Sequence, residues 1–180
     1  MLQYFDLPIL QFIRTHIVHP ALDPVMSFLD FHGFGIPLCI LIGAVLLCIR
    51  RTRKYGLICL AAVAVTGLVN LGIKELVARP RPFISHDLPP LILPPVGYSF
   101  PSGHTQQAFT VATVLLFANK KLGVIAMAVA SLVGFSRMYV GVHYPTDVLV
   151  GALLGIAIGF LVDRLIDSWL TRRKQSRSVR

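Results

Sequence analysis

The sequence is poor in acidic residues, in cysteine and in charge of any kind. Only 8 of its 180 residues are Asp or Glu, and they form no carboxylate cluster of the kind that binds Mg²⁺. We therefore expect neither a metal ion nor a cofactor. The cysteines, Cys39, Cys48 and Cys59, all lie in apolar runs, which argues against a disulfide framework or a cysteine metal site.

The shortage of charge also excludes an ordinary soluble domain. Charged residues make up 14% of the chain, 55% of the residues are hydrophobic and the mean hydropathy is +0.73, whereas soluble proteins are about a quarter charged. Residues 31–49 and 55–73 form two uncharged stretches of 19 residues each. About 20 such residues cross a bilayer as a helix, so the composition predicts an integral membrane protein.

No Pro/Ser-rich linker and no internal repeat divides the chain, so we expect one membrane-embedded domain over residues 1–180. The predicted fold class is all-α, a polytopic transmembrane helix bundle of five to six spans. Residues 3–18 predict an N-terminal interfacial helix or a short spanning helix. They lack a basic start and a small-residue cleavage site, so we do not expect a cleavable signal peptide.

Five further segments predict the spans of the bundle. They cover about residues 34–49, 55–77, 102–121, 122–139 and 145–169, and a short helix at 24–31 precedes the first. Pro80 and Pro82 forbid continuation of the second helix. The following loop, 83–100, contains four more prolines and is expected to be extended.

The net charge of +9 is concentrated in a few places. Most Lys and Arg residues lie in the loops 50–54 and 120–121 and beyond residue 163. Alternating spans bring these segments to one side, which the positive-inside rule assigns to the cytoplasm together with the C-terminus. Membrane lipids are therefore the expected partners of the basic residues, and nucleic acid is not. The sequence predicts no particular oligomeric state.

Three polar clusters interrupt the apolar segments. The first contains Lys74 and Arg81, the second is 101–104, and the third runs from Ser136 to Asp147. They lie after the second predicted span, before the third, and at the turn between the fourth and fifth. The same alternation therefore places all three clusters at one membrane surface, opposite the basic loops.

The second cluster, Pro-Ser-Gly-His, has the features of an anion-binding helix start. Ser102 is a preferred N-cap residue before an apolar run, and free backbone N–H groups at a helix start favour an anion. Gly103 permits close approach of a ligand to the backbone, and His104 lies in the first turn. An ordinary capped helix with an incidental histidine is the competing interpretation.

The third cluster pairs a histidine with a carboxylate. Pro145 suits the first turn of a helix, which places His143 just outside it and Asp147 inside it. Asp147 can fix the tautomer of His143 and leave its other nitrogen free to attack. A favourable charge at the helix start and a hydrogen-bonded interfacial histidine are the simpler interpretations.

Three cations accompany the histidines. Lys74, Arg81 and Arg137 could each extend to lipid headgroups, but together they would neutralise a bound phosphate and its transition state. Glu75 and Arg79 are spaced to pair with each other along a helix.

These residues resemble the type 2 phosphatidic acid phosphatase family, which also includes vanadium-dependent haloperoxidases. The resemblance covers residues 74–147 and rests on three motifs that occur in order with full spacing. They are Lys-x6-Arg-Pro at 74–82, Pro-Ser-Gly-His at 101–104 and Ser-Arg-x5-His-x3-Asp at 136–147.

The resemblance implies a role for each motif residue. His143 is the expected nucleophile that forms a phosphohistidine, Asp147 orients it, and His104 protonates the leaving oxygen. The expected phosphate-binding residues are Lys74, Arg81, Ser102, Gly103 and Arg137. The family implies a metal-independent phosphatase acting on a lipid phosphate at the outer face of a cell (cytoplasmic) membrane.

The sequence leaves the lipid open. Undecaprenyl diphosphate is the favoured substrate, and phosphatidylglycerophosphate and phosphatidic acid are the alternatives. A non-catalytic lipid-phosphate binder or transporter would use the same cations, and a haloperoxidase-like activity is a further alternative.

Overall fold

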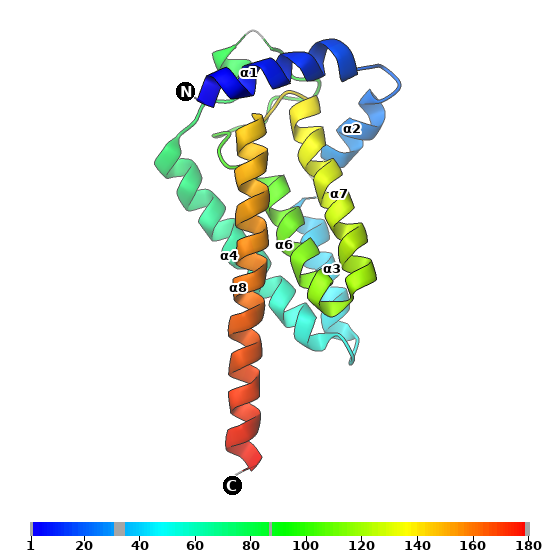
Figure 1. Cartoon of the computed structure of the whole chain (residues 1–180), viewed down its shortest axis with the longest axis vertical. Helices are drawn as coiled ribbons and strands as arrows, with labels where there is room; N and C mark the ends of the chain where they lie inside the picture. The colour runs from blue at the N-terminus through cyan, green and yellow to red at the C-terminus, as the bar shows by residue number, and fades with distance from the viewer. Residues whose placement is uncertain (1, 31–34, 87, 179–180) are drawn as a thin grey trace.

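The computed structural model describes residues 2–30, 35–86 and 88–178, and every regular element in these ranges is helical (Figure 1). This confirms the predicted all-α class. The elements are α1 (Leu2–Phe12), the π-helical turn η1 (Ile13–Ile17), α2 (Asp23–Asp30), α3 (Ile36–Cys48), α4 (Arg53–Val77), α5 (Pro82–Ser85), α6 (Gly103–Ala118), α7 (Lys120–Tyr139) and α8 (Pro145–Ser178).

Five helices form the bundle, and they match the five predicted spans. The helices α3, α4, α6, α7 and α8 run up and down the long axis, with α6 packed against α4, α7 and α8 (Figure 1). Within the described ranges, the segments Arg53–Ser85, Lys120–Tyr139 and Pro145–Arg172 are long and apolar enough to cross a membrane. The remaining two, with 13 and 16 residues, are shorter than the ~20 residues of a full span.

The helix α6 lies at the centre of the bundle and buries polar side chains there. Thr105, Gln106, Gln107 and Thr110 are buried against neighbouring helices. Gln106 Oε1 accepts a hydrogen bond from Asn70 Nδ2 of α4 at 2.7 Å, and the hydroxyls of Thr66 and Thr110 lie 2.9 Å apart. Because polar side chains inside a membrane bundle hydrogen-bond across helices, a central helix needs less hydrophobicity than a lipid-facing one.

The interface between α6 and α8 depends on close backbone approach. A Cβ atom added at Gly155 would lie 2.3 Å from the carbonyl oxygen of Gln106. Small residues allow such contact in membrane bundles. An apolar core cluster of the bundle includes Cys39, Ile58 and Val114. Cys39 and Cys59 are free and buried, and Cys48 is free and exposed.

The N-terminal segment lies across the end of the bundle. Figure 1 shows α1 running nearly at right angles to the bundle helices, which supports the interfacial alternative over the short span. Ile13 and Met26 pack into a second apolar cluster with Tyr139, Val140 and Val142. The outward side chains Tyr4, Phe5 and Phe12 are exposed. This segment therefore has an apolar outer face at the end of the bundle.

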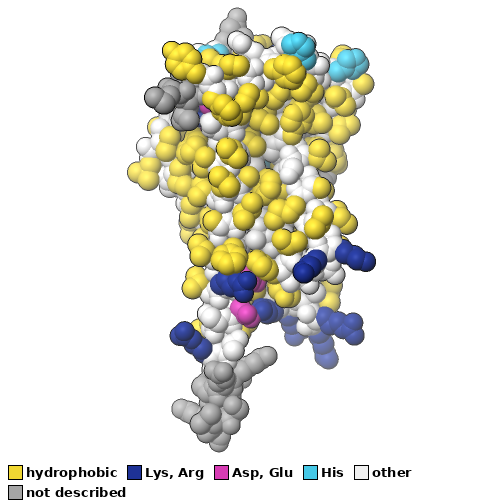
Figure 2. Space-filling view, in the orientation of Figure 1, with side chains coloured by type: hydrophobic (Ala, Val, Ile, Leu, Met, Phe, Trp, Pro, Cys, Tyr) yellow, Lys and Arg dark blue, Asp and Glu magenta, His cyan; other side chains and the backbone are white. Residues whose placement is uncertain are grey.

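Basic side chains gather at the opposite end (Figure 2). The exposed residues Arg50, Arg51, Arg53, Lys120 and Lys121 come from the two loops that the sequence singled out. Side chains from position 173 onward and the start of the first predicted span, Phe34, lie outside the described residues. An apolar belt covers much of the surface between the two ends (Figure 2).

Candidate active site

The end of α4 directs two arginines toward the end of the bundle. Ala78 has a left-handed backbone (φ 47°), and its N–H donates to Lys74 O at 2.9 Å, which closes the helix. Pro80 then prevents α4 from continuing, and Pro82 begins the separate short helix α5. Arg79 and Arg81 therefore leave the helix on an extended segment instead of continuing along its surface.

The loop before α6 wraps around the cations of the first motif. Arg81 Nε donates to the carbonyl oxygen of Gly97 at 2.8 Å, and Lys74 Nζ donates to that of Tyr98. Gly97 has a φ of 84°, a conformation that favours glycine. The backbone of this loop thereby holds Lys74 and Arg81 together.

The turn between α7 and α8 places two residues of the third motif side by side. Gly141 has a φ of 81°, which lets the chain reverse tightly. The N–H groups of Val142 and His143 donate to Arg137 O at 3.2 and 3.3 Å. Arg137 and His143 are each 2% exposed, so the turn buries a cation next to a histidine.

The two ring nitrogens of His143 have different environments. Nε2 lies 3.3 Å from Arg81 Nη1, and Nδ1 lies 3.4 Å from Asp147 Oδ2. Because a guanidinium can only donate, this contact requires a lone pair on Nε2 and therefore a proton on Nδ1. The Nδ1–Asp147 separation is at the long end for a hydrogen bond, and within the described residues Nδ1 has no other partner. It is an electrostatic contact that can shorten when a substrate binds.

The surroundings of His143 favour its neutral form. Burial, followed by the charges of Arg137, Arg81, Lys74 and His104, holds the pKa of His143 well below its ordinary value of 6.5. Both causes disfavour a positive ring. His143 therefore keeps a lone pair available for attack at neutral pH.

Asp147 is held from several sides. Its Oδ1 accepts from Arg79 Nη1 at 2.6 Å, and its Oδ2 accepts from the Tyr144 N–H at 2.9 Å. The side chain is fully buried. The predicted pairing of Arg79 with Glu75 is wrong, since Arg79 forms ion pairs with Asp6 and Asp147 instead. The left-handed turn at Ala78 carries Arg79 away from the α4 surface, where Glu75 remains exposed.

The start of α6 brings the second motif to the same place. The Ser102 N–H donates to the backbone oxygen of Asp147 at 3.1 Å. Ser102 occupies the N-cap position as predicted, but its hydroxyl lies 2.9 Å from the Thr105 hydroxyl and caps no backbone N–H. To bind a phosphate, the hydroxyl of Ser102 would have to exchange this partner.

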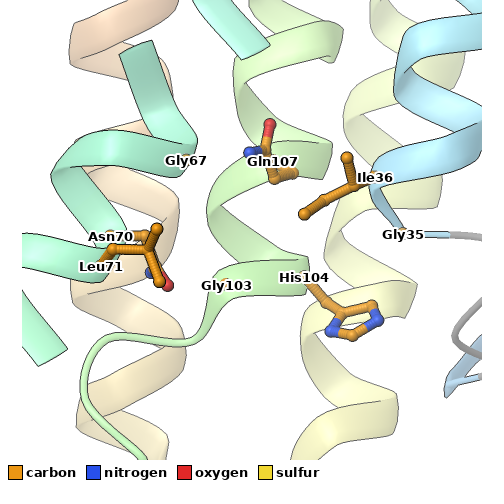
Figure 3. Close-up of a pocket in the computed structure, with 8 residues that line it drawn as sticks. All are labelled: Gly35, Ile36, Gly67, Asn70, Leu71, Gly103, His104 and Gln107. Carbon is orange, nitrogen blue, oxygen red and sulfur yellow. The ribbon is translucent and has the colours of Figure 1, made fainter. Parts of the chain in front are cut away.

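Gly103 and His104 line a cavity (Figure 3), and His104 also borders a second one. A Cβ added at Gly103 would lie 3.2 Å from Asn70 Oδ1, and one added at Gly35 would lie 2.8 Å from His104 Nε2. The first cavity, of about 190 Å³, lies among α3, α4 and α6. The second, of about 290 Å³, extends along α3, α6 and α7 between apolar side chains such as Ile42, Val111 and Val129. His104 borders both cavities.

The structure brings all three motifs together. Arg81 contacts His143, which joins the first motif to the third, and Ser102 contacts Asp147, which joins the second to the third. His104 is one of the charges that lower the pKa of His143. Three cations around a neutral histidine can bind an anion and stabilise a phosphoryl transition state. Within the described residues no group of His, Cys, Asp or Glu is arranged to hold a metal ion.

Sequence reasoning missed three residues that surround Asp147. Asp6 and Thr146 bind Arg79, and Arg79 in turn binds Asp147. A lone carboxylate in an apolar helix and the first arginine of Arg-Pro-Arg-Pro were the available signals. Neither indicated the other, because they lie 73 positions apart.

Comparison with known proteins decides the family. The sequence profile of the PAP2 superfamily matches residues 55–169, which is more than half of the chain. The chain belongs to the PAP2 superfamily. The matched segment contains all three motifs and most of the bundle from α4 to α8, so the family predicted from the motifs is confirmed.

Individual PAP2 relatives agree over most of the chain. Undecaprenyl-diphosphatase BcrC of Bacillus subtilis (strain 168) is 36% identical over 151 residues, covering 82% of this chain and 76% of the relative. Phosphatidylglycerophosphatase B of the same organism is 37% identical over 160 residues, covering 81% and 76%. The crystal structure of a transmembrane PAP2 type phosphatidylglycerolphosphate phosphatase from Bacillus subtilis has a TM-score of 0.77 at 34% identity, covering 93% of this chain and 87% of that one. The bundle is thus a membrane PAP2 fold.

Proposed function

We propose that this PAP2 protein is an integral membrane phosphatase that hydrolyses undecaprenyl diphosphate to undecaprenyl phosphate and phosphate. The observation that carries the proposal is the neutral, buried His143, with Nε2 facing a guanidinium and Nδ1 facing Asp147. PAP2 membership and the similarity to the undecaprenyl-diphosphatase BcrC and to phosphatidylglycerophosphatase B support hydrolysis of a lipid phosphate.

The reaction has two steps. His143 Nε2 attacks the terminal phosphorus, the bond from that phosphorus to the bridging oxygen breaks, and His104 supplies a proton to that oxygen as undecaprenyl phosphate leaves. Lys74, Arg81 and Arg137 balance the charge of the transferred group. Water then attacks the phosphohistidine and returns a proton to His104, and phosphate leaves as Nε2 recovers its lone pair. The proton on Nδ1 stays opposite Asp147, which stabilises the charged ring during both steps.

The apolar lining of the second cavity favours a substrate with a long apolar tail. It begins at His104 and continues along α3, α6 and α7 to Leu122, near the other end of the bundle. A polyprenyl chain can lie along such a groove while its diphosphate enters the cationic cluster. Phosphatidylglycerophosphate is the second candidate, because phosphatidylglycerophosphatase B is similarly related. Phosphatidic acid has the same headgroup chemistry.

The charge distribution supports an orientation. The exposed basic loops lie at the end opposite the site (Figure 2). By the positive-inside rule, this distribution favours a site on the external face of the cytoplasmic membrane and a C-terminus inside the cell. The single domain over residues 1–180 stays a prediction.

Phosphate release is the direct test. Purified protein in detergent with EDTA is offered undecaprenyl diphosphate, phosphatidylglycerophosphate and phosphatidic acid, and the released phosphate is measured. We expect undecaprenyl diphosphate to give the highest kcat/KM. His143→Gln should abolish release and retain lipid binding, whereas His16→Gln, an exposed histidine of η1, should remain active.

Three results would contradict the proposal. Hydrolysis that survives His143→Gln would show that His143 is not the nucleophile. Lipid binding without hydrolysis by the unaltered protein would indicate a binder or transporter. Halide oxidation with added vanadate would indicate the haloperoxidase alternative. A preference for another lipid phosphate would change only the substrate.

A further inference from the structure

A fully buried carboxylate on α1 contacts the residues that surround Asp147. Asp6 Oδ2 accepts from Arg79 Nη2 at 2.6 Å and from the Thr146 hydroxyl at 2.7 Å, and its Oδ1 accepts from the Thr146 N–H at 2.9 Å. Asp6 lies outside the segment 55–169 that matches the family profile. The family resemblance therefore assigns it no role.

Arg79 connects Asp6 to Asp147. Its Nη2 binds Asp6, and its Nη1 binds Asp147 Oδ1 at 2.6 Å and the Thr146 hydroxyl at 2.8 Å. The guanidinium carbon also lies 3.8 Å from the centre of the Tyr144 ring. A planar fork held by two carboxylates and an aromatic face has little freedom to move. Its position therefore depends on both carboxylates.

Asp6 also acts as an N-cap for α8 from another part of the chain. Thr146 lies in the first turn of α8, where backbone N–H groups have no intrahelical acceptor. Asp6 accepts that N–H. The same turn contains Asp147, so one carboxylate fixes both the guanidinium and the backbone that determine where Asp147 points.

We propose that Asp6 is a positioning residue, which acts through Arg79 to keep Asp147 Oδ2 directed at His143 Nδ1. The inference rests on the proposed function of His143 and Asp147. Through Asp6, α1 would take part in catalysis by way of Arg79, without a direct contact to the cations of the phosphate site.

The alternative is that α1 only anchors the N-terminal segment. Other contacts already supply an anchor: Ile13 and Met26 pack against α7, and Tyr139 donates to Asp23 Oδ1 at 2.7 Å. Asp23 therefore serves as a matched control. It is a carboxylate of the same segment that tethers the same end of the bundle, but its bond leads to Tyr139 and not to Arg79.

The test compares Asp6→Asn with Asp23→Asn in the full chain. Asn can still accept the Thr146 N–H, because it is a good N-cap residue, so Asp6→Asn removes the charge that holds Arg79 and keeps the cap. Misplacing a catalytic group by about 1 Å can cost about 100-fold in rate. We expect Asp6→Asn to lower kcat by about 10- to 100-fold with KM changed less than about three-fold, because the phosphate cations stay in place. Asp23→Asn should retain kcat.

A double-mutant cycle separates positioning from anchoring. If Asp6 acts through Arg79, Asp6→Asn should cost less than about three-fold when Arg79→Gln is already present, since coupled residues are not additive. Independent losses that multiply would overturn the inference. Arg79→Lys provides a second route, because an ammonium cannot bridge two carboxylates as a fork does. It should lower kcat as Asp6→Asn does, even if the latter fails to fold.

The outcomes distinguish the two proposals. Lack of phosphate release by the unaltered protein would refute the proposed function. An active protein whose Asp6→Asn variant keeps kcat within about two-fold, or falls no further than Asp23→Asn, would refute the positioning role alone. Equal losses in kcat and in thermal stability for both variants would show anchoring only.

Discussion

Replacing Asp147 by Asn is the sharpest perturbation of the proposed mechanism. The change keeps the size of the side chain and removes one negative charge from the neighbourhood of His143 Nδ1. It also leaves Arg79 with Asp6 as its remaining carboxylate among the ion pairs described here. The nucleophile, His104 and the three cations are untouched, so the variant isolates the support that the carboxylate gives to a charged imidazole.

The magnitude follows from the 3.4 Å separation of Nδ1 and Asp147 Oδ2. Two unit charges at that distance interact by about 5 kcal/mol at an effective dielectric constant of about 20. If roughly half of the positive charge has developed on the ring in the transition state, about 2.5 kcal/mol of stabilisation is lost, which lowers kcat by roughly 50- to 100-fold. Substrate binding depends on the cations, so KM should change little.

Single-turnover phosphate release at saturating lipid measures this loss. Asp163→Asn is the matched control, since Asp163 is a buried carboxylate near the middle of the same helix. Its variant should keep the activity of the unaltered protein. A fall of less than about three-fold for Asp147→Asn would refute the electrostatic argument. A loss as complete as that of His143→Gln would show that Asp147 maintains the site itself.

Two further predictions concern the pH profile and helix packing. The pKa of His143 lies below 6.5, so the nucleophile stays neutral as the pH falls through that value. We therefore expect kcat/KM to decrease only at lower pH. A decrease in kcat/KM that sets in at or above pH 6.5 would contradict this prediction. Gly155→Ala should lower the melting temperature in detergent, because the added Cβ would lie 2.3 Å from Gln106 O. The Cβ added by Gly72→Ala would meet nothing within 4 Å, so this control should keep or raise the melting temperature. A lower melting temperature for Gly72→Ala than for Gly155→Ala would contradict the close contact.

The sequence predicted the bundle because each span carries a local signal. Apolar length located the helices α3, α4, α7 and α8, and the prolines after Val77 located the end of α4. The alternation of spans then placed the three motifs at one end without any knowledge of packing. Bounds differed mainly at α8, which continues to Ser178 instead of ending near residue 169, because polar residues can extend a helix beyond the membrane.

The contacts of the site were decided by tertiary structure. The Ser102 hydroxyl contacts the Thr105 hydroxyl and not a backbone N–H group. Arg79 pairs with Asp6 and Asp147, and not with Glu75. These choices depend on which partners packing brings within reach, and a local spacing rule compares only neighbours along one helix.

The sequence alone determined which chemical groups meet at one membrane surface, because hydropathy and proline positions predict the order of the spans and the ends of the helices. Only the folded molecule decided how those groups face one another. Asp6 and Arg79 lie 73 positions apart, and nothing in either local sequence encodes the angle at which α1 crosses the bundle. That angle depends on contacts between assembled helices, such as the packing of Ile9 of α1 against the cluster that contains Met26 and Tyr139.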